Sequence, residues 1–362
     1  LNLTTNKTYK LSFKAKSTTA FKIPKISLMQ CNSPWADRYS YHSDLSPSIS
    51  TDWDNYSVYY TANCTDPNGR ITFYLGDALP EGSTLYLSNI SFTETSNLNL
   101  FPDIGNIIFN DGEACGTKVF NESELTDQNK FWYDKKNQTI KIYSEKNPAE
   151  IYHKIECALT KPIINESNKS YVVYNGLDLR YGGSHGISGG NTHHISILNC
   201  DISYMGGGIQ ENVFQNDGSP VRFGNGVEFW DNAHDNLVDG CNISDIYDSG
   251  LTNQGNDNGI QQYNIIYRNN TIKNAEMSFE YWNTGVGGKT HDIIFENNIC
   301  INAGGGWGHI QRPNPTGAHI MLYPNTADTS NLVITNNTFE NAKSYSIYVY
   351  QPWNGIENLK FK

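Results

Sequence analysis

A unit of roughly two dozen residues recurs through the second half of the chain, and this repeat restricts the folds that the chain can adopt. Its most regular part is a turn followed by an apolar residue, found at Asn199–Ile202, Gly240–Ile243, Asn269–Ile272, Asn297–Cys300 and Asn336–Phe339. A second short strand follows seven or eight residues later, as at Ile209 after Ile202 and Phe279 after Ile272. No segment has the 3.6-residue apolar period of a long helix. We therefore predict an all-β fold, a right-handed parallel β-helix, over residues 171–362.

The repeat also predicts which side chains stack from coil to coil. The apolar positions should form one interior column, consisting of Ile202, Ile243, Ile272, Cys300 and Phe339. The amides of Asn270, Asn298 and Asn337 should stack at one turn, each bonding the backbone of a neighbouring coil. Cys200 and Cys241 share a position on adjacent coils, and we interpret them as buried thiols rather than a disulfide.

Residues 1–96 have a different pattern, in which short runs alternate apolar and polar residues between Gly, Pro and Asp turns. The runs are Tyr9–Ala15, Lys25–Leu28, Tyr56–Tyr60, Arg70–Leu75 and Ser83–Phe92, as in a β-sandwich. Their order and their Tyr-x-Leu-Ser-Phe and Phe-Tyr-Leu-Gly segments resemble the jelly-roll carbohydrate-binding modules that are appended to glycan-active enzymes. The alternative is a spacer sandwich without a ligand. Residues 97–170 are irregular and are predicted to cap the open end of the solenoid and lead into it.

Composition excludes several classes of partner. Lys and Arg number 26 against 37 Asp and Glu, and the net charge of −11 argues against nucleic acid or an anionic membrane surface. No apolar run reaches about 18 residues, so no membrane-spanning helix is expected. The seven Cys are spread singly without the spacing of metal ligands, so no metal site is predicted.

Aligning the second strand of each coil assigns side chains to the two faces of a sheet, because side chains alternate along a strand. The inward positions are Ile187, Val227, Leu251, Phe279, Ile320 and Ile347. The residues that follow them must point outward: Ser188, Glu228, Thr252, Glu280, Met321 and Tyr348. Two positions further, the outward residues are Gly190, Trp230, Gln254, Trp282, Tyr323 and Tyr350. The outer face of this sheet therefore carries two carboxylates and a row of aromatic rings.

This face is a candidate catalytic surface. Glu228 and Glu280 lie two coils apart, about 9.6 Å between backbones, a spacing that suits the acid and base of an inverting glycoside hydrolase. The sugar would be bound by the outward side chains Trp230, Gln254, Trp282 and Tyr323. The alternative is a solvated sheet face with scattered charge. Asp248, in the turn before Leu251, is either a reserve acid or base, or a turn residue bonding its own backbone.

Two longer connections, 210–225 and 304–318, interrupt the repeat before strands of this sheet. Insertions at a common position should stack into the walls of a groove. Their Arg222, His309 and Arg312 would either hold a carboxylated or sulfated sugar or pack the loops.

The coils resemble the right-handed parallel β-helix proteins of the pectin-lyase-like superfamily, which are mostly polysaccharide lyases, glycoside hydrolases and epimerases. Of the polygalacturonase motifs, only Ser184-His185-Gly186 is similar, and the outward strand positions carry no basic residue, unlike pectate lyases. The first hypothesis is thus a secreted or cell-surface glycoside hydrolase acting on a polysaccharide without a cofactor. The second is a lyase or epimerase of uronic-acid polymers, with Ca²⁺ as an option. The third is a non-catalytic glycan-binding or surface-structural protein.

Overall fold

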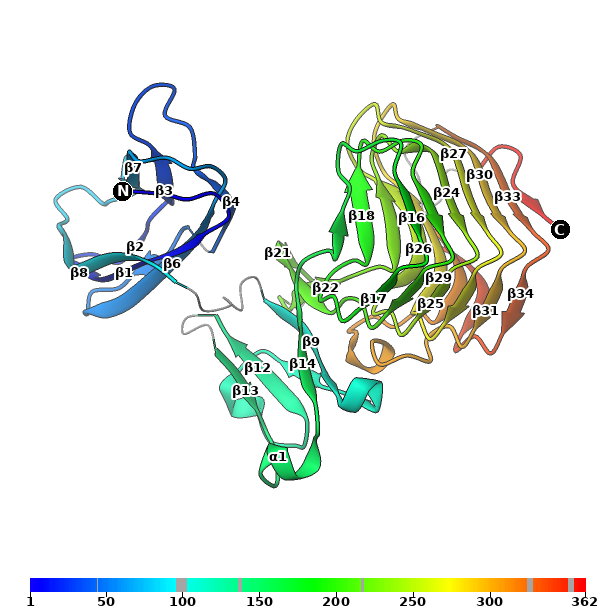
Figure 1. Ribbon diagram of the computed structural model, residues 1–362, viewed down its shortest axis with the longest axis horizontal. Helices are drawn as coiled ribbons and strands as arrows, with labels where there is room; N and C mark the ends of the chain where they lie inside the picture. The colour runs from blue at the N-terminus through cyan, green and yellow to red at the C-terminus, as the bar shows by residue number, and fades with distance from the viewer. Residues whose placement is uncertain (44, 96–102, 136–138, 216–217, 324–327, 351–354) are drawn as a thin grey trace. The chain divides into compact units, whose positions relative to one another are not determined.

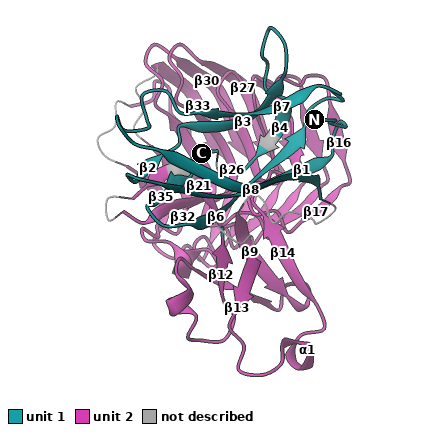
Figure 2. Ribbon diagram, turned by 90° about the vertical axis from the view of Figure 1, so that its left-hand side faces the viewer, with its two compact units in different colours: residues 1–101, 135–138 teal, residues 102–134, 139–362 magenta. Residues whose placement is uncertain are grey.

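The computed structural model describes residues 1–43, 45–95, 103–135, 139–215, 218–323, 328–350 and 355–362. The chain divides into two compact units, residues 1–101 with 135–138 and residues 102–134 with 139–362 (Figure 2). The expected all-β fold class is confirmed: small antiparallel sheets are followed by three long parallel sheets of a β-helix. In the described part of the chain, no helix has the length and apolar character needed to cross a membrane.

The first unit is built from antiparallel strands with alternating burial. Its largest sheet has the order β4 (Tyr39–His42), β6 (Asp54–Ala62), β1 (Thr8–Ser17), β8 (Leu85–Glu94). Two smaller pairs accompany it: β3 (Lys25–Gln30) with β7 (Gly69–Tyr74), and β2 (Phe21–Lys22) with β5 (Ser48–Ile49). Every second residue of β1 is buried, and these residues share one apolar core with β3 and β6. The period of two in the sequence is thus the period of the packed face.

The second unit begins with two small sheets. One contains β9 (Ile104–Phe109), β10 (Ala114–Cys115) and β14 (Ile155–Leu159). The other contains β11 (Thr117–Val119), β12 (Lys130–Asp134) and β13 (Thr139–Ile142). Four one-turn helices are described in this unit: η1 (Asn110–Gly112), η2 (Glu122–Glu124), α1 (Pro148–Ile151) and, in the 304–318 loop, η3 (His309–Gln311). We call residues 103–134 the lead-in segment, because they contact the β-helix as described below.

Each coil of the β-helix contributes one strand to each of up to three parallel sheets. The sheet that carries the outward carboxylates, here called the site sheet, contains β15 (Ile164–Asn165), β18 (Ile187–Gly190), β23 (Val227–Trp230), β26 (Ser249–Gly255), β29 (Met277–Asn283), β32 (Ala318–Leu322) and β35 (Tyr345–Val349). The second sheet contains β16 (Val173–Asn175), β19 (Ser196–Leu198), β24 (His234–Asp239), β27 (Gln261–Arg268), β30 (Lys289–Glu296), β33 (Asp328–Thr335) and β36 (Lys360–Phe361). Figure 1 shows the successive coils side by side, for example at β24, β27, β30 and β33. The third contains β17 (Asp178–Arg180), β20 (Asp201–Ser203), β25 (Asn242–Ser244), β28 (Thr271–Lys273), β31 (Ile299–Ile301) and β34 (Thr338–Glu340). The first coil therefore starts before the expected boundary at residue 171.

The predicted interior column is confirmed in register. Ile202, Ile243, Ile272, Cys300 and Phe339 pair in sequence along the third sheet. The first four are at most 1% exposed, whereas Phe339 in the last described coil is half-buried. The continuation predicted from Ile202 to Ile209 is wrong, because β21 (Gly208–Phe214) forms an antiparallel hairpin with β22 (Pro220–Phe223). The site sheet resumes only at Val227.

The asparagine stack is also confirmed. Oδ1 of Asn298 accepts the backbone N–H of Asn270 at 2.9 Å, and its Nδ2 donates to the carbonyl of Tyr267 at 3.1 Å. Asn337 bonds Asn298 and the carbonyl of Phe295 in the same way. Each amide thus satisfies backbone groups that a buried turn would otherwise leave without partners.

Cys200 and Cys241 extend this stack toward the first coils. Both thiols are buried and free, and Sγ of Cys241 accepts the backbone N–H of Cys200 at 3.4 Å. The residue before each stacked position has a left-handed backbone, with φ between 49° and 69° at Asn199, Gly240, Asn269, Asn297 and Asn336. Asn and Gly tolerate this conformation best, which explains why they recur at the turns.

Candidate active site

A cavity of about 570 Å³ opens on the outer face of the site sheet. Its floor consists of outward side chains of β23, β26 and β29. The β21–β22 hairpin and the 304–318 loop contribute further lining residues, among them Gln210 and Val221 from the hairpin, and Pro313 and Asn314 from the loop. Glycines at the start of the strands let adjacent coils approach closely: a Cβ on Gly226 would lie 2.4 Å from the carbonyl oxygen of Gly250. The two interruptions of the repeat therefore border one cavity, which we call the site cavity.

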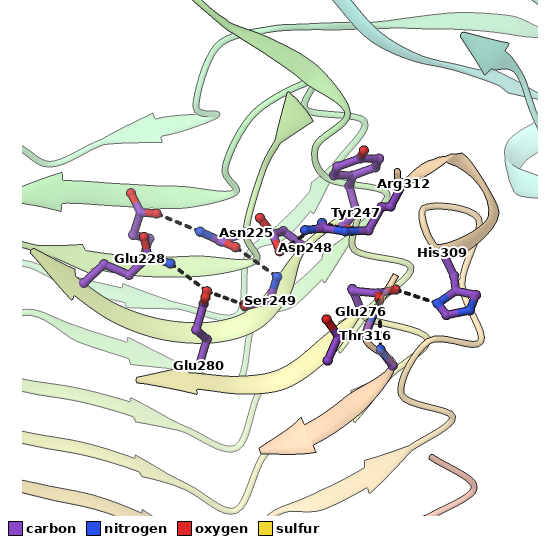
Figure 3. A network of polar contacts seen from close by, with 12 residues as sticks. Asn225, Glu228, Tyr247, Asp248, Ser249, Glu276, Glu280, His309, Arg312 and Thr316 are labelled. Carbon is purple, nitrogen blue, oxygen red and sulfur yellow. Dashed lines mark hydrogen bonds and ion pairs between the residues drawn. The ribbon is translucent and has the colours of Figure 1, made fainter. Parts of the chain in front are cut away.

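The structure brings Glu228 and Glu280 into this cavity and buries both. They pair with Thr252 between them in the predicted register, and are 8% and 6% exposed. The outer face of the site sheet is therefore not a solvated surface at Glu228 and Glu280. A chain of hydrogen bonds connects the two carboxyls (Figure 3): Asn225 Nδ2 donates to Glu228 Oε2 at 2.7 Å, Ser249 N donates to Asn225 Oδ1 at 2.9 Å, and Ser249 Oγ donates to Glu280 Oε2 at 2.8 Å.

Glu280 has an environment that favours its protonated form. Burial is the main cause that raises the pKa of Glu280 to about 8, and the negative charge of Asp248 adds to it. Oε2 also accepts from Gln254 Nε2 at 2.7 Å, in addition to the Ser249 hydroxyl. The Ser249 hydroxyl and the Arg312 charge lower the pKa of Glu280 without offsetting burial. At neutral pH, Glu280 therefore mostly retains its proton.

Glu228 has different neighbours. In addition to the Asn225 amide, Nε2 of His185 lies 3.5 Å from Glu228 Oε1. The backbone N–H of Asn225 donates to His185 Nδ1 at 3.1 Å, so in the neutral ring the proton is on Nε2 and faces the carboxylate. Both neighbours present N–H groups to the Glu228 carboxyl and orient it.

Asp248 lies in the same cavity, directly before β26, and is paired. Arg312 Nη1 donates to Asp248 Oδ1 at 3.0 Å and to the carbonyl of Tyr247 at 3.3 Å. Burial raises the pKa of Asp248, while the Arg312 guanidinium opposes the change. Figure 3 shows this ion pair beside the chain that connects Glu228 and Glu280. The Asp248 side chain therefore pairs with Arg312 instead of bonding its own backbone as a simple turn residue would.

The predicted aromatic residues line the cavity next to the carboxyls. The rings of Trp230 and Trp282, two coils apart, lean toward each other, with centroids at 5.7 Å and planes at 30°. Gln254 lies between them in register, and Tyr323 stacks on Tyr350 at 5.1 Å. Trp230, Trp282 and Tyr323 are partly exposed and present apolar surface to a ligand.

Arg222 lines the cavity, but its donors are used within the protein. Nε donates to the carbonyl of Gly207 at 2.8 Å, Nη1 to Gln311 Oε1 at 3.0 Å and Nη2 to the carbonyl of Gly105 at 3.3 Å. Its guanidinium also lies over the ring of Tyr247, 4.7 Å from the centroid. The contacts of Arg222 are therefore those of a loop-packing residue, the second of the two alternatives that the sequence left open.

Gln311 connects the 304–318 loop to the lead-in segment as well as to the hairpin. Its Oε1 accepts the backbone N–H of Lys118 at 3.2 Å, and its Nε2 donates to the carbonyl of Gly116 at 2.9 Å. Asp103 Oδ2 accepts the backbone N–H of Ile209 on the hairpin at 2.8 Å. The lead-in segment thus holds both insertions that border the cavity.

His309 lies outside the cavity lining and contacts a carboxylate instead. Its Nδ1 is 2.9 Å from Oε2 of Glu276, which is 2% exposed. Glu276 Oε1 accepts the backbone N–H groups of Thr316 and Gly317 at 2.5 and 2.9 Å. Glu276 therefore holds the end of the 304–318 loop, and His309 packs that loop rather than facing the cavity.

Of the predicted residues, the structure gathers Glu228, Asp248, Glu280, Trp230, Trp282, Gln254, Tyr323, Arg222 and Arg312 around the site cavity and leaves His309 outside it. The sequence analysis missed Asn225, Ser249, Tyr247 and Gln311. Asn225 and Ser249 each stand directly before a glycine, Gly226 and Gly250, near the start of a site-sheet strand, and this shared position was the available signal. Within the described residues, no group of three or more His, Cys, Asp or Glu is arranged to hold a metal ion.

Neither a protein-family model nor a curated protein sequence matches the chain. A solved structure described as "CBM4 structure and function" is 22% identical, covering 26% of this chain and 69% of its own, with a TM-score of 0.23. The N-terminal cellulose-binding domain of β-1,4-glucanase C from Cellulomonas fimi is 23% identical, covering 27% and 66%, with a TM-score of 0.23. A structure described as a glycoside hydrolase is 9% identical over 95% of this chain and 68% of its own, with a TM-score of 0.32. At these identities and TM-scores, the activities of these proteins do not transfer to this chain.

Proposed function

We propose that the chain is a glycan-active protein whose β-helix is an inverting glycoside hydrolase acting on a polysaccharide outside the cell. One observation carries the proposal. Two buried carboxyl groups lie in one cavity, two coils apart on the site sheet; burial raises the pKa of Glu280 to about 8, whereas Glu228 faces the N–H groups of Asn225 and His185. Two carboxyl groups with different environments in one cavity can serve as the general acid and the general base of glycoside hydrolysis.

Glu280 is the proposed general acid. Its pKa of about 8 keeps it protonated at neutral pH, and its Oε2 is occupied by the Ser249 and Gln254 donors. Oε1 has no hydrogen-bond partner within the described residues and would carry the proton. Glu280 would transfer this proton to the glycosidic oxygen as the bond from that oxygen to the anomeric carbon breaks.

Glu228 is the proposed general base. The N–H groups of Asn225 and His185 hold and orient its carboxyl group. It would take a proton from a water molecule whose oxygen attacks the anomeric carbon from the opposite face of the sugar, so that the configuration inverts. Backbones about 9.6 Å apart leave room for that water between the carboxyls and the sugar. The charge of Asp248 would help Glu280 retain its proton, against the smaller opposing effect of Arg312.

The aromatic row supports a polymeric substrate. Trp230, Trp282 and Tyr323 follow the direction in which the coils stack, on either side of Glu280. Stacking on successive rings would bury the apolar faces of successive sugars while their hydroxyls stay hydrated. The reaction requires no cofactor.

The test is a screen of polysaccharides with products resolved by mass, followed by NMR assignment of the first anomer released. Glu228→Gln and Glu280→Gln should each lower kcat by at least about 10²-fold while the substrate still binds. Glu340→Gln, at an exposed residue of β34, is the matched control and should leave kcat unchanged. Full activity of either site variant would overturn the assignment, a retained anomer would overturn inversion, and an unsaturated product would indicate a lyase instead.

A further inference from the structure

The neutral polar groups that line the site cavity are mainly side-chain amides. They come from the hairpin, from the site sheet and from the 304–318 loop: Gln210, Gln215, Asn225, Gln254, Asn256 and Asn314. An amide can donate to one sugar hydroxyl and accept from another, because it has two N–H donors and a carbonyl acceptor. This lining, together with the aromatic rings, suits a ligand whose polar groups are hydroxyls.

The basic side chains among the described lining residues already form contacts within the protein. Arg222 uses Nε, Nη1 and Nη2 for Gly207, Gln311 and Gly105, and it is 7% exposed. Three of the five N–H donors of Arg222 are thus used for contacts inside the protein, including those to Gln311 of the 304–318 loop and to Gly105 of the lead-in segment.

Arg312 is the second basic residue, and its charge is matched within the cavity. Nη1 is bonded to Asp248 Oδ1 at 3.0 Å, and the guanidinium lies 5.2 Å from the centroid of the Tyr247 ring. His185, the third, uses Nδ1 to accept from the Asn225 backbone and directs Nε2 at Glu228. Neither residue offers a ligand an uncompensated positive charge.

One carboxyl of the cavity has no arginine or lysine partner among the described residues. Asp248 is paired with Arg312, whereas Glu228 has only His185 within ion-pair distance and the Asn225 amide as a hydrogen-bond donor. A uronate carboxylate or a sulfate beside Glu228 would therefore approach an acidic group in a buried setting, and a like charge at such a position is an arrangement that excludes wrong partners from an interface.

We infer that the site cavity takes an uncharged polysaccharide, recognised through its hydroxyls by the amides and through its ring faces by the aromatic row, and that it excludes uronic-acid and sulfated polymers. This inference rests on the proposed function and narrows it. Of the two alternatives that the sequence left open for Arg222, His309 and Arg312, it favours loop packing over the binding of a carboxylated or sulfated sugar.

The test compares matched ligands that differ only in charge, using the full chain with Glu280→Gln. Glutamine has the shape and charge of the protonated Glu280, so turnover stops while the electrostatics of the cavity are preserved. Suitable pairs are gluco-oligosaccharides with and without oxidation at C6, and oligogalacturonides with and without methyl esters. Isothermal titration at neutral pH should give at least about tenfold tighter binding of the uncharged member in each pair that binds.

A charged member that binds as tightly as its neutral match, or more tightly, would overturn the inference and leave hydrolysis of an acidic polymer in place. If neither member of any pair binds, and a wider panel of neutral and acidic glycans also fails, the proposed function itself falls. The two failures are therefore distinguishable.

A second variant tests the charge matching directly. Adding Asp248→Asn removes the partner of Arg312 and should reduce the preference for the neutral ligand by about tenfold. Asp178→Asn is the matched control, since Asp178 forms an exposed ion pair with Arg180 at 2.6 Å on the third sheet and should leave the preference unchanged. An unchanged preference with Asp248→Asn would show that the Asp248–Arg312 pair does not set the charge selectivity.

Discussion

The protonation of Glu280 can be tested without knowing the substrate, through the pH dependence of stability. Glu280→Gln replaces the buried acid by a neutral group of the same shape. In the wild type, the pKa is about 8 in the folded state against an ordinary value of 4.5. Between these values the folded chain keeps a proton that the unfolded chain releases, so the stability contributed by protonated Glu280 is fully present below pH 4.5 and is lost as pH rises toward 8. The glutamine variant has no such loss.

The magnitude follows from the two pKa values. The slope between them approaches about 1.4 kcal/mol per pH unit. The free energy of unfolding of Glu280→Gln minus that of the wild type should therefore increase by about 3 kcal/mol between pH 5.5 and 7.5. Because Glu280 is 6% exposed, solvent screening reduces this value little.

The assay is urea denaturation of both full-length proteins at half-unit pH steps, followed by circular dichroism and tryptophan fluorescence. Taking the difference between variant and wild type removes the contributions of all groups that titrate alike in both. Glu340→Gln, with an exposed side chain, should give a difference that is independent of pH. If the Glu280→Gln difference is equally flat, within about 0.5 kcal/mol, Glu280 is ionised at neutral pH and is not the general acid.

Three further predictions concern the asparagine stack, the first coil and the aromatic row. Asn298→Ala removes the acceptor of Asn270 N–H and the donor to the Tyr267 carbonyl, and should lower the free energy of unfolding by about 2–4 kcal/mol. The control Asn242→Ala loses only an exposed contact with another side chain and should lower it by less than about 0.5 kcal/mol in the same denaturation series. Equal losses in the two variants would refute a stabilising asparagine stack. Glu166 is fully buried, its carboxyl oxygens have no hydrogen-bond partner among the residues that the structure describes, and burial raises its pKa to about 7. The free energy of unfolding of the wild type relative to Glu166→Gln should therefore fall as pH rises from 5 to 7, and a constant difference would contradict this. Trp282→Ala should weaken glycan binding about tenfold in a titration calorimeter, and unchanged affinity would remove the ring from the binding surface.

The register of the β-helix could be predicted from the sequence, because it depends on local rules. Side chains alternate along a strand, and the coils repeat at a nearly fixed period, so aligning short segments is enough to place Glu228, Thr252 and Glu280 in one row. The stacked asparagines were predictable for the same reason: a buried turn needs partners for its backbone, and the same residue type recurs at the same place.

The burial that makes this row a candidate active site was decided by the tertiary structure. The insertions do not follow the repeat, and their positions depend on contacts distant in sequence. Arg222 reaches the carbonyl of Gly105, 117 residues away, and Gln311 bonds Lys118, 193 residues away. The alternation of side chains along a strand predicts that Glu280 points outward. Only the packing of these insertions against the lead-in segment determines that "outward" means a confined cavity, and that confinement raises the pKa of Glu280.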